Sequence, residues 1–179
     1  QVAAEMIARD GGDAVTVRQI AAEVGASTTF ITKYFSDKTD LLLLAYKYSS
    51  TTAVTRFEKR IADKPGDVIS SLVSLTAIDE ETRAGWRVHI AFWDKAVRDP
   101  VLSGELRYWI EYARKSIEAA IKAGYGPGGD IGGAAQQAIA LIHGISIQLL
   151  FDPLSWSRER IHEALARQIE MILGRGPSS

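Results

Sequence analysis

A short segment near residue 30 carries polar side chains that could together contact a nucleic acid, namely Thr28, Thr29, Thr32 and Lys33. If this segment is a helix that buries Ile31, these side chains face water on the opposite side. Hydroxyl and ammonium groups can hydrogen-bond to base edges or phosphates, and a threonine methyl group can pack against the methyl group of thymine. The pattern therefore indicates a helix that could lie in the major groove of DNA.

Phosphate contacts are expected from residues around this segment. Thr16 and Ser27 stand where helices are predicted to begin, and such positions favour anions. Tyr34 offers its phenol, and Lys38 adds an ammonium group at the start of a fourth helix. Residues 1 to 47 contain five Lys or Arg against six Asp or Glu, so DNA binding would have to rest on a local surface.

Aromatic residues concentrate between residues 86 and 112, and helical spacing places residues 86, 89 and 93 on one face. The candidate ligand-binding set is Trp86, His89, Phe92, Trp93, Tyr108, Trp109 and Tyr112, with His143 further along the chain. Such residues can form an ordinary core, or a concave apolar site whose hydroxyl, indole and imidazole groups orient a ligand. Several rings around a cavity could also hold a quaternary or guanidinium cation. Both interpretations stay open at this point.

Catalysis and metal binding have little support. The chain has no cysteine, three histidines without His-x-x-x-His spacing, and no Gly-x-Ser-x-Gly elbow. The Gly-rich segment 124 to 129 contains Pro127 and lacks both a preceding strand and a following lysine, so it is predicted to be a connector rather than a phosphate-binding loop. We expect no enzyme, no metal and no cofactor.

Composition indicates an ordered globular protein, since 46% of the 179 residues are hydrophobic and 21 Lys or Arg balance 22 Asp or Glu. Apolar runs such as residues 41 to 46 are shorter than the roughly 20 residues that span a bilayer. No basic-then-apolar leader opens the sequence. A cytoplasmic protein with no membrane partner is expected.

Helical periodicity runs along the whole sequence, and no strand pattern is evident. Thr16 and Gln19 fit a capping box, and Ser36 or Asp37 could cap the fourth helix. About nine helices are predicted, at residues 3–10, 16–24, 27–34, 37–63, 67–78, 80–97, 99–123, 130–151 and 155–173. The fold class is therefore all-α.

Two modules are predicted because the composition changes near residue 45. Residues 1–46 would form a three-helix module and residues 47–179 a larger bundle. The helices at 16–24 and 27–34, joined through Gly25, have the dimensions of a helix-turn-helix. A shared core is expected from Ile7, Ile20, Ala21, Val24, Ile31, Phe35 and Leu41. The pattern alone also fits a helical hairpin with no DNA role.

The last two predicted helices carry small and aliphatic residues at helical spacing. The proposed dimer-interface residues are Ala135, Ala138, Ile142, Ile145, Ile161, Leu165, Gln168, Ile169 and Ile172. Small residues allow close helix approach, so a two-fold four-helix interface between two copies of the chain is the hypothesis.

The run Thr16-Val-Arg-Gln-Ile-Ala-Ala-Glu-Val-Gly-Ala-Ser27, followed by Ile31, Tyr34-Phe35, Lys38 and Leu41-Leu42, resembles the DNA-binding signature of TetR-family transcriptional repressors. The resemblance covers about residues 3 to 46 closely and the rest by helical layout only. It implies DNA-facing positions for Thr16, Ser27, Thr28, Thr29, Lys33, Tyr34 and Lys38. We expect Thr28, Thr29 and Thr32 to read bases. Thr29 and Thr32 differ from the residues common in the family, which predicts an unusual operator sequence.

The resemblance also implies a homodimer that holds a palindromic operator and is released by a small-molecule effector bound among the helices after the fourth. The segments at 86–94 and 152–161 are similar to the branch that includes the choline-responsive repressor of betaine synthesis, but branch membership does not specify the effector. A helical small-molecule-binding protein without DNA-binding activity is the alternative.

Overall fold

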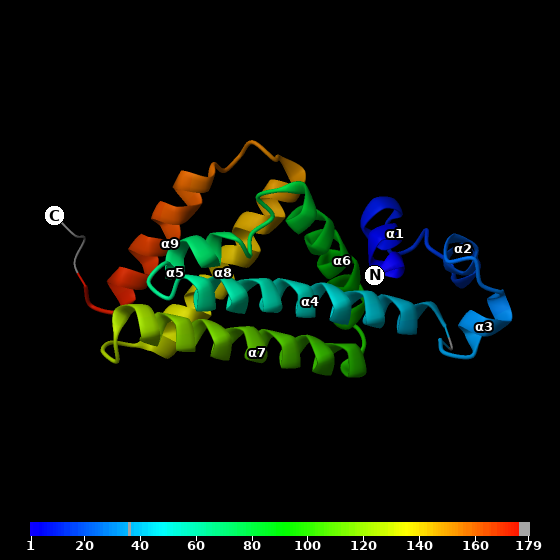
Figure 1. The fold of residues 1–179 in the computed structure, drawn as a ribbon, viewed down its shortest axis with the longest axis horizontal. Coiled ribbons are helices and arrows are strands. Elements are labelled where there is room, and N and C mark those ends of the chain that lie inside the picture. Colours follow the sequence, from blue (N-terminus) through cyan, green and yellow to red (C-terminus); the bar gives the residue numbers. More distant parts are fainter. Residues whose placement is uncertain (36, 176–179) are drawn as a thin grey trace. The chain divides into compact units, whose positions relative to one another are not determined.

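The computed structural model describes residues 1–35 and 37–175, and within them the chain is all-helical with no strand (Figure 1). The helices are α1 (Val2–Asp10), α2 (Val17–Glu23), α3 (Thr28–Thr32), α4 (Lys38–Asp63), α5 (Val68–Val73), α6 (Glu80–Ala96), α7 (Pro100–Tyr125), α8 (Ile131–Phe151) and α9 (Arg158–Ile172). The predicted fold class is confirmed.

The described chain divides into two compact units. The first unit comprises residues 1–52 and 84–107, and the second comprises residues 53–83 and 108–179. Helices α4, α6 and α7 each contribute residues to both units. The module boundary predicted at residues 46 and 47 lies within α4, and it differs from this division because the first unit also includes much of α6.

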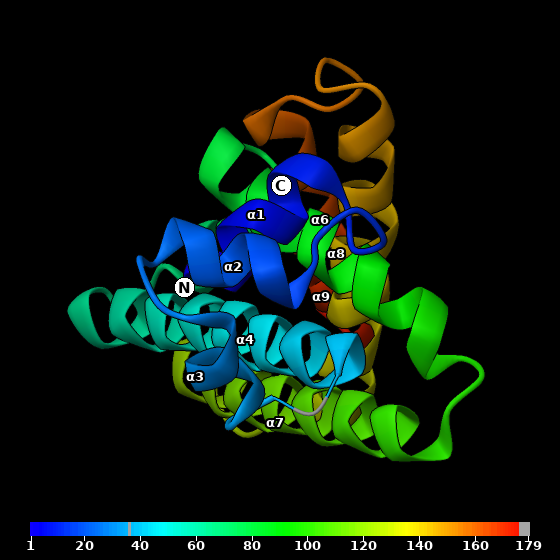
Figure 2. The ribbon, with the colours of Figure 1, turned by 90° about the vertical axis from the view of Figure 1, so that its right-hand side faces the viewer.

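Local capping fixes the helix starts of the first unit. The Thr16 hydroxyl accepts the Gln19 backbone N–H at 3.2 Å, and the Gln19 side chain accepts the Thr16 N–H at 2.9 Å, which is the predicted capping box. The Ser27 hydroxyl accepts the Phe30 N–H at 3.1 Å. Gly25 has φ +64°, which suits glycine in the turn that joins α2 to α3 (Figure 2). Ser36 lies outside the described residues.

Asp37 caps α4, because one of its carboxylate oxygens accepts the backbone N–H groups of Thr39 at 2.7 Å and Asp40 at 3.0 Å. Asp99 opens α7 in the same way and accepts the N–H groups of Val101 and Leu102. The cap at Asp37 confirms one of the two capping residues predicted for α4.

The predicted core of the first unit is partly wrong. The buried members are Ile7, Ile20, Ala21, Ile31 and Leu41. Val24 is exposed because it lies beyond the last residue of α2, with non-helical backbone angles that take it off the buried face. Phe35 is half-buried, since α3 ends at Thr32 instead of continuing to residue 34.

Helix α5 ends at Val73, whereas the sequence pattern predicts a helix to residue 78. Hydroxyl groups in this segment hydrogen-bond to nearby backbone carbonyls: Ser74 donates to Ser71 at 2.6 Å, and Thr76 donates to Val73 at 2.7 Å. Such bonds compete with the helical ladder, and Ser and Thr therefore favour turns after a helix.

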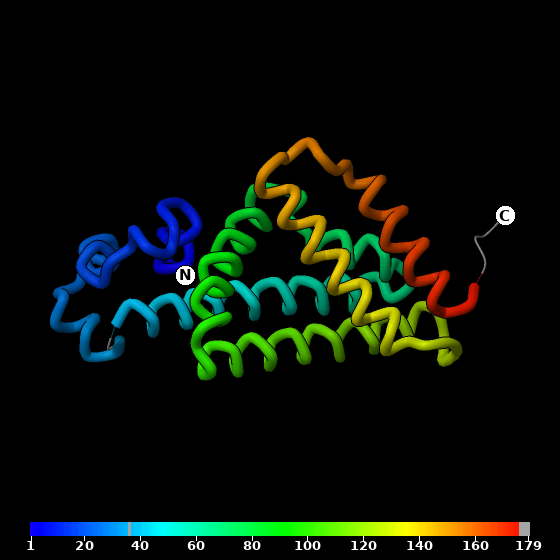
Figure 3. The backbone as a smooth tube through the Cα atoms, turned by 180° about the vertical axis from the view of Figure 1, so that it is seen from behind, coloured from blue at the N-terminus to red at the C-terminus, as the bar shows by residue number. Residues whose placement is uncertain are grey.

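The core of the second unit is built on α8 and α9, which run in opposite directions and pack together, with α5 against both (Figure 3). Seven residues of the predicted dimer stripe belong to this core: Ala135, Ala138, Ile142, Ile145, Ile161, Leu165 and Ile169. Each is buried within a single chain, so their assignment to a dimer surface is corrected. Gln168 and Ile172 keep partial exposure. Helix α8 is apolar on both faces. The sequence pattern therefore could not distinguish the face that packs inside the subunit from the face that is directed outward.

By length and composition alone, α8 could cross a membrane, although no such span was predicted from the sequence. Its 21 residues include no charged side chain, although Gln and His interrupt the apolar runs. A core helix of a water-soluble protein gives the same pattern, and α8 buries one face against α9.

Candidate nucleic-acid interface and aromatic site

Helix α3 presents the predicted polar surface. Thr28, Thr29, Thr32 and the following residue Lys33 are all exposed, and Ile31 is the residue of α3 that is buried. The Thr32 hydroxyl donates to the Thr29 backbone carbonyl at 3.2 Å. With its proton engaged in this way, Thr32 offers its oxygen as an acceptor and its methyl group as an apolar contact.

An exposed aromatic pair extends this surface. The rings of Phe30 and Tyr34 have centroids 5.3 Å apart, and both side chains are more than half exposed. Tyr34 was expected here from the sequence, but Phe30 was missed. The signal for Phe30 is its position four residues before Tyr34, which places the two rings on one side of a helical turn.

Thr16 and Ser27, expected near phosphate, are engaged in capping their own helices. The Thr16 hydroxyl also donates to the Gln19 side chain at 2.7 Å. Their position at the helix starts is as predicted, but the structure assigns their side-chain oxygens to the backbone of α2 and α3.

Lys38 is held by the turn before α2. Its ammonium group donates to the backbone carbonyl of Asp13 and lies 3.6 Å from the Asp13 carboxylate. Lys95 of α6 approaches the same carboxylate oxygen at 3.4 Å. Hydrogen bonding and charge from Lys95, followed by the charge of Lys38, hold the pKa of Asp13 below its usual value.

Aromatic side chains of α6 form a connected cluster within the first unit. The Trp86 ring meets the Trp93 ring edge to face at 5.8 Å, and the His89 ring lies 5.3 Å from that of Trp86. Phe92 is fully buried and stacks against Tyr46 of α4 with ring centroids 3.9 Å apart. These contacts bring together the four α6 residues predicted from the sequence.

Tyr46 also belongs to this cluster but was not predicted from the sequence, because it lies on another helix 40 residues before Trp86. Burial raises its pKa to about 12, so its hydroxyl stays protonated at neutral pH. The charge of Glu105 on α7 acts in the same direction, and Glu105 pairs with Lys47 at 3.1 Å. Ser50 adds a hydroxyl 3.4 Å from the imidazole Nε2 of His89. The cluster thus combines aromatic faces with hydroxyl, imidazole and carboxylate groups.

The remaining predicted ligand residues lie in the second unit. Tyr108, Trp109 and Tyr112 contact one another on α7, with Tyr108 and Tyr112 exposed. The expectation that these two tyrosines face a cavity is therefore corrected, because they point to solvent from one side of α7. The nearby charge of Glu58 raises the pKa of Tyr112. His143 lies on α8, where burial lowers its pKa to about 4 and keeps the imidazole neutral.

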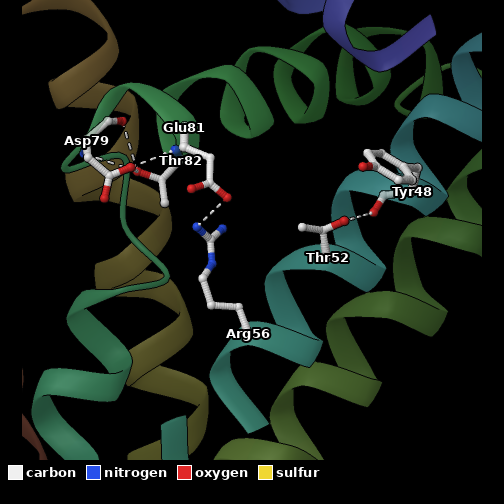
Figure 4. A network of polar contacts seen from close by, with 6 residues as sticks. All are labelled: Tyr48, Thr52, Arg56, Asp79, Glu81 and Thr82. Atoms are coloured by element: carbon white, nitrogen blue, oxygen red, sulfur yellow. Dashed lines mark hydrogen bonds and ion pairs between the residues drawn. The ribbon is translucent and has the colours of Figure 1, made fainter. Parts of the chain in front are cut away.

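The start of α6 is fixed by a polar network (Figure 4). Asp79 accepts the Thr82 N–H at 2.9 Å, and the Thr82 hydroxyl accepts the Asp79 N–H at 3.1 Å. Arg56 of α4 pairs with Glu81 at 3.1 Å. Within residues 1–35 and 37–175, no three His, Asp or Glu side chains converge as metal ligands. Because its hydrogen bonds form the first turn of α6 and its ion pair joins that turn to α4, we assign this network a structural role.

Two family models match the chain. Residues 1–45 match the model of bacterial regulatory proteins of the tetR family, and residues 68–174 match that of the C-terminal part of BetI-type transcriptional repressors. The chain belongs to the TetR family of transcriptional regulators. The first model covers α1 to α3 and the beginning of α4, and the second covers α5 to α9.

Individual relatives agree with this TetR-family assignment. The transcriptional regulator PksA of Bacillus subtilis is 27% identical over 180 residues, with 93% of this chain and 84% of PksA covered. A regulator from Rhodococcus has a TM-score of 0.81 at 22% identity, over 97% of this chain and 92% of that one. A regulator from Saccharomonospora viridis, solved in complex with choline, has a TM-score of 0.78 at 26% identity, over 94% and 92% of the two chains. The present chain therefore carries a tetR-family region at residues 1–45 and a BetI-type C-terminal region at residues 68–174.

Proposed function

We propose that this TetR-family regulator is a homodimeric repressor that holds a palindromic operator through α3 and is released by a small-molecule effector. The observation that carries the proposal is the exposed face of Thr28, Thr29, Thr32 and Lys33, presented after a glycine turn. In helix-turn-helix dimers the second helix of each copy lies in the major groove, with half-site centres about 34 to 36 Å apart or a multiple of this distance.

The contacts divide into two kinds. Thr28, Thr29 and Thr32 read bases, while Lys33, Tyr34 and Lys38 contact phosphates. An electrophoretic shift with palindromes from the DNA upstream of the gene tests this proposal, followed by footprinting of any bound duplex. We expect two protected half-sites at the stated spacing. No shift with any such duplex at low salt would contradict DNA binding.

For the effector, we propose the aromatic cluster of Trp86, His89, Trp93 and Tyr46 as the recognition site. Aromatic faces attract cations, and the Glu105 carboxylate adds negative charge near Tyr46. The choline complex of the Saccharomonospora relative makes quaternary ammonium compounds the first class to test. Titration with choline should quench tryptophan fluorescence saturably, and the quenching should be lost in a Trp93→Leu variant.

We propose that the dimer forms through the outer faces of α8 and α9, in place of the buried stripe. Gly144 on α8 and Met171 on α9 are exposed, and apart from its chain neighbours and the backbone of its own helix, a Cβ at Gly144 would meet no atom within 4 Å. Close approach of a second copy at Gly144 would give this glycine a function, since glycine within an exposed helix otherwise only destabilises it.

A ligand-binding protein without DNA-binding activity is the second candidate, supported by the five basic against six acidic residues of the first 47. The footprinting experiment separates the two candidates. We further propose that the protein works in the cytoplasm, without a cofactor, a catalytic reaction or a membrane partner, as expected for a regulator whose target is DNA.

A further inference from the structure

Three charged side chains meet where the turn before α2 approaches the beginning of α4 and the end of α6. The Asp13 carboxylate oxygen Oδ1 lies 3.6 Å from the Lys38 ammonium and 3.4 Å from the Lys95 ammonium. We refer to Asp13, Lys38 and Lys95 as the charge triad. All three belong to the first unit, so these distances lie within one compact part of the chain.

The backbone keeps the turn against α6. A Cβ built on Gly12 would lie 3.0 Å from the Ala91 side chain, so the chain approaches α6 closely at the residue before Asp13. A hollow of about 360 Å³ beside this contact is lined by residues of the turn, α4 and α6, including all three members of the charge triad. The turn that carries Asp13 therefore packs on α6 next to the triad, while the Asp13 side chain itself is 83% exposed and remains accessible to solvent.

We propose that Asp13 competes with operator phosphate for Lys38, and that Lys95 sets the strength of this competition. The inference rests on the proposed DNA-binding function. The Asp13 carboxylate offsets part of the positive charge of Lys38 and repels an approaching phosphate, so Asp13 lowers the affinity for DNA. Lys95 neutralises part of the Asp13 charge and thereby frees Lys38.

This arrangement connects DNA binding to α6, the helix that carries the aromatic cluster. Lys95 lies two residues after Trp93 on that helix. If α6 shifts and withdraws Lys95 from Asp13, Lys38 becomes the only ammonium group beside the Asp13 carboxylate. The contact of Lys38 with phosphate is then weaker. Asp94 also approaches Lys95, at 3.8 Å, but pairs more closely with Arg98 at 3.1 Å. Asp94 is therefore a matched neighbour that does not reach Lys38.

A double-mutant cycle tests the competition, with a labelled 30-base-pair duplex of random sequence as the probe. A phosphate contact does not depend on sequence, so no operator is needed. Asp13→Asn should tighten binding, and the factor should be about two- to fivefold larger when Lys38 is present than in the Lys38→Gln background, as exposed pairs of this kind typically contribute. Dividing the factor measured with Lys38 present by the factor measured in the Lys38→Gln background removes the general effect of deleting a negative charge. Equal factors in the two backgrounds would overturn the inference.

The role of Lys95 is tested in the same way. Lys95→Gln should weaken binding about twofold more when Asp13 is present than in the Asp13→Asn background, whereas Asp94→Asn should show no coupling to Lys38. Coupling of Asp94 equal to that of Asp13 would contradict a specific triad.

A measurement without DNA separates failure of this inference from failure of the proposed function. Titration of Asp13 followed by carboxyl ¹³C NMR should show its pKa moving up toward the ordinary value in Lys95→Gln and in Lys38→Gln. An unchanged pKa in both variants would show that the triad does not form in solution. A triad that forms in a protein that binds no duplex at any salt would overturn the DNA-binding proposal, and the competition with it.

Discussion

Replacing Leu165 by alanine tests whether the stripe on α8 and α9 is a core or a contact between subunits. Leu165 is fully buried within one chain, on a helix that packs against both α8 and α5. Removing a buried leucine side chain costs its transfer free energy and leaves a cavity, together about 2 to 5 kcal/mol. Ile161 and Ile169 flank it on the same helix and are equally buried, so little collapse is possible. We expect a loss of about 3 kcal/mol in unfolding free energy.

The assay is urea denaturation followed by far-ultraviolet circular dichroism, with light scattering of the native protein in parallel. The Leu165→Ala variant should unfold at lower urea while its native mass stays that of the wild type. Lys59→Ala on α4 is the control, because Lys59 is exposed and lies outside the proposed interface, and the free energy of unfolding of this variant should change by less than about 0.5 kcal/mol. A Leu165→Ala protein of unchanged stability but halved mass would refute the core assignment.

Three further changes test other parts of the structure. Gly144→Arg should leave the subunit fold intact, since a Cβ at this position meets no other helix or loop of the chain within 4 Å, and it should halve the mass seen by light scattering. A full-size dimer would contradict the proposed outer interface. Thr16→Ala should lower the free energy of unfolding by about 1 kcal/mol through loss of the N-cap of α2. Urea denaturation measures this loss, and Arg18→Ala, at an exposed position of α2 that does not cap the helix, is the control. The free energy of unfolding should fall as the pH drops from about 6.5 to about 4, because His143 takes up a proton in the unfolded chain before it does so in the folded one. In His143→Gln that part of the pH dependence should be smaller, and identical profiles would refute the assignment.

Features fixed by neighbouring residues could be predicted from the sequence. The capping box at Thr16 and Gln19, the Ser27 cap and the acidic caps at Asp37 and Asp99 each depend on contacts within three residues. The polar face of α3 could also be predicted from neighbouring residues, because burial of Ile31 alone determines which side chains of that short helix face water.

Features that depend on tertiary packing could not be predicted in this way. Tyr46 of α4 stacks on Phe92 of the α6 aromatic cluster, and no local sequence pattern links two residues that are so far apart in the chain. Helix α8 is apolar around its circumference, so periodicity could not separate its buried face from its outer one. The contact of Lys38 with Asp13 also joins distant segments, which is why Lys38 was predicted as a phosphate contact without its acidic partner.

The central claim is that α3 reads operator bases while Lys38 contacts the phosphate backbone. The most direct measurement is selection of duplexes from a random library by the wild type, Thr32→Ala and Lys38→Ala side by side, with the salt dependence of each. We predict that Thr32→Ala changes the preferred base at defined positions. Lys38→Ala should keep the wild-type sequence preference, bind all duplexes more weakly and lower the salt slope by about one unit. The same change in sequence preference and salt slope for both variants, or selection of no common sequence by the wild type, would contradict the account.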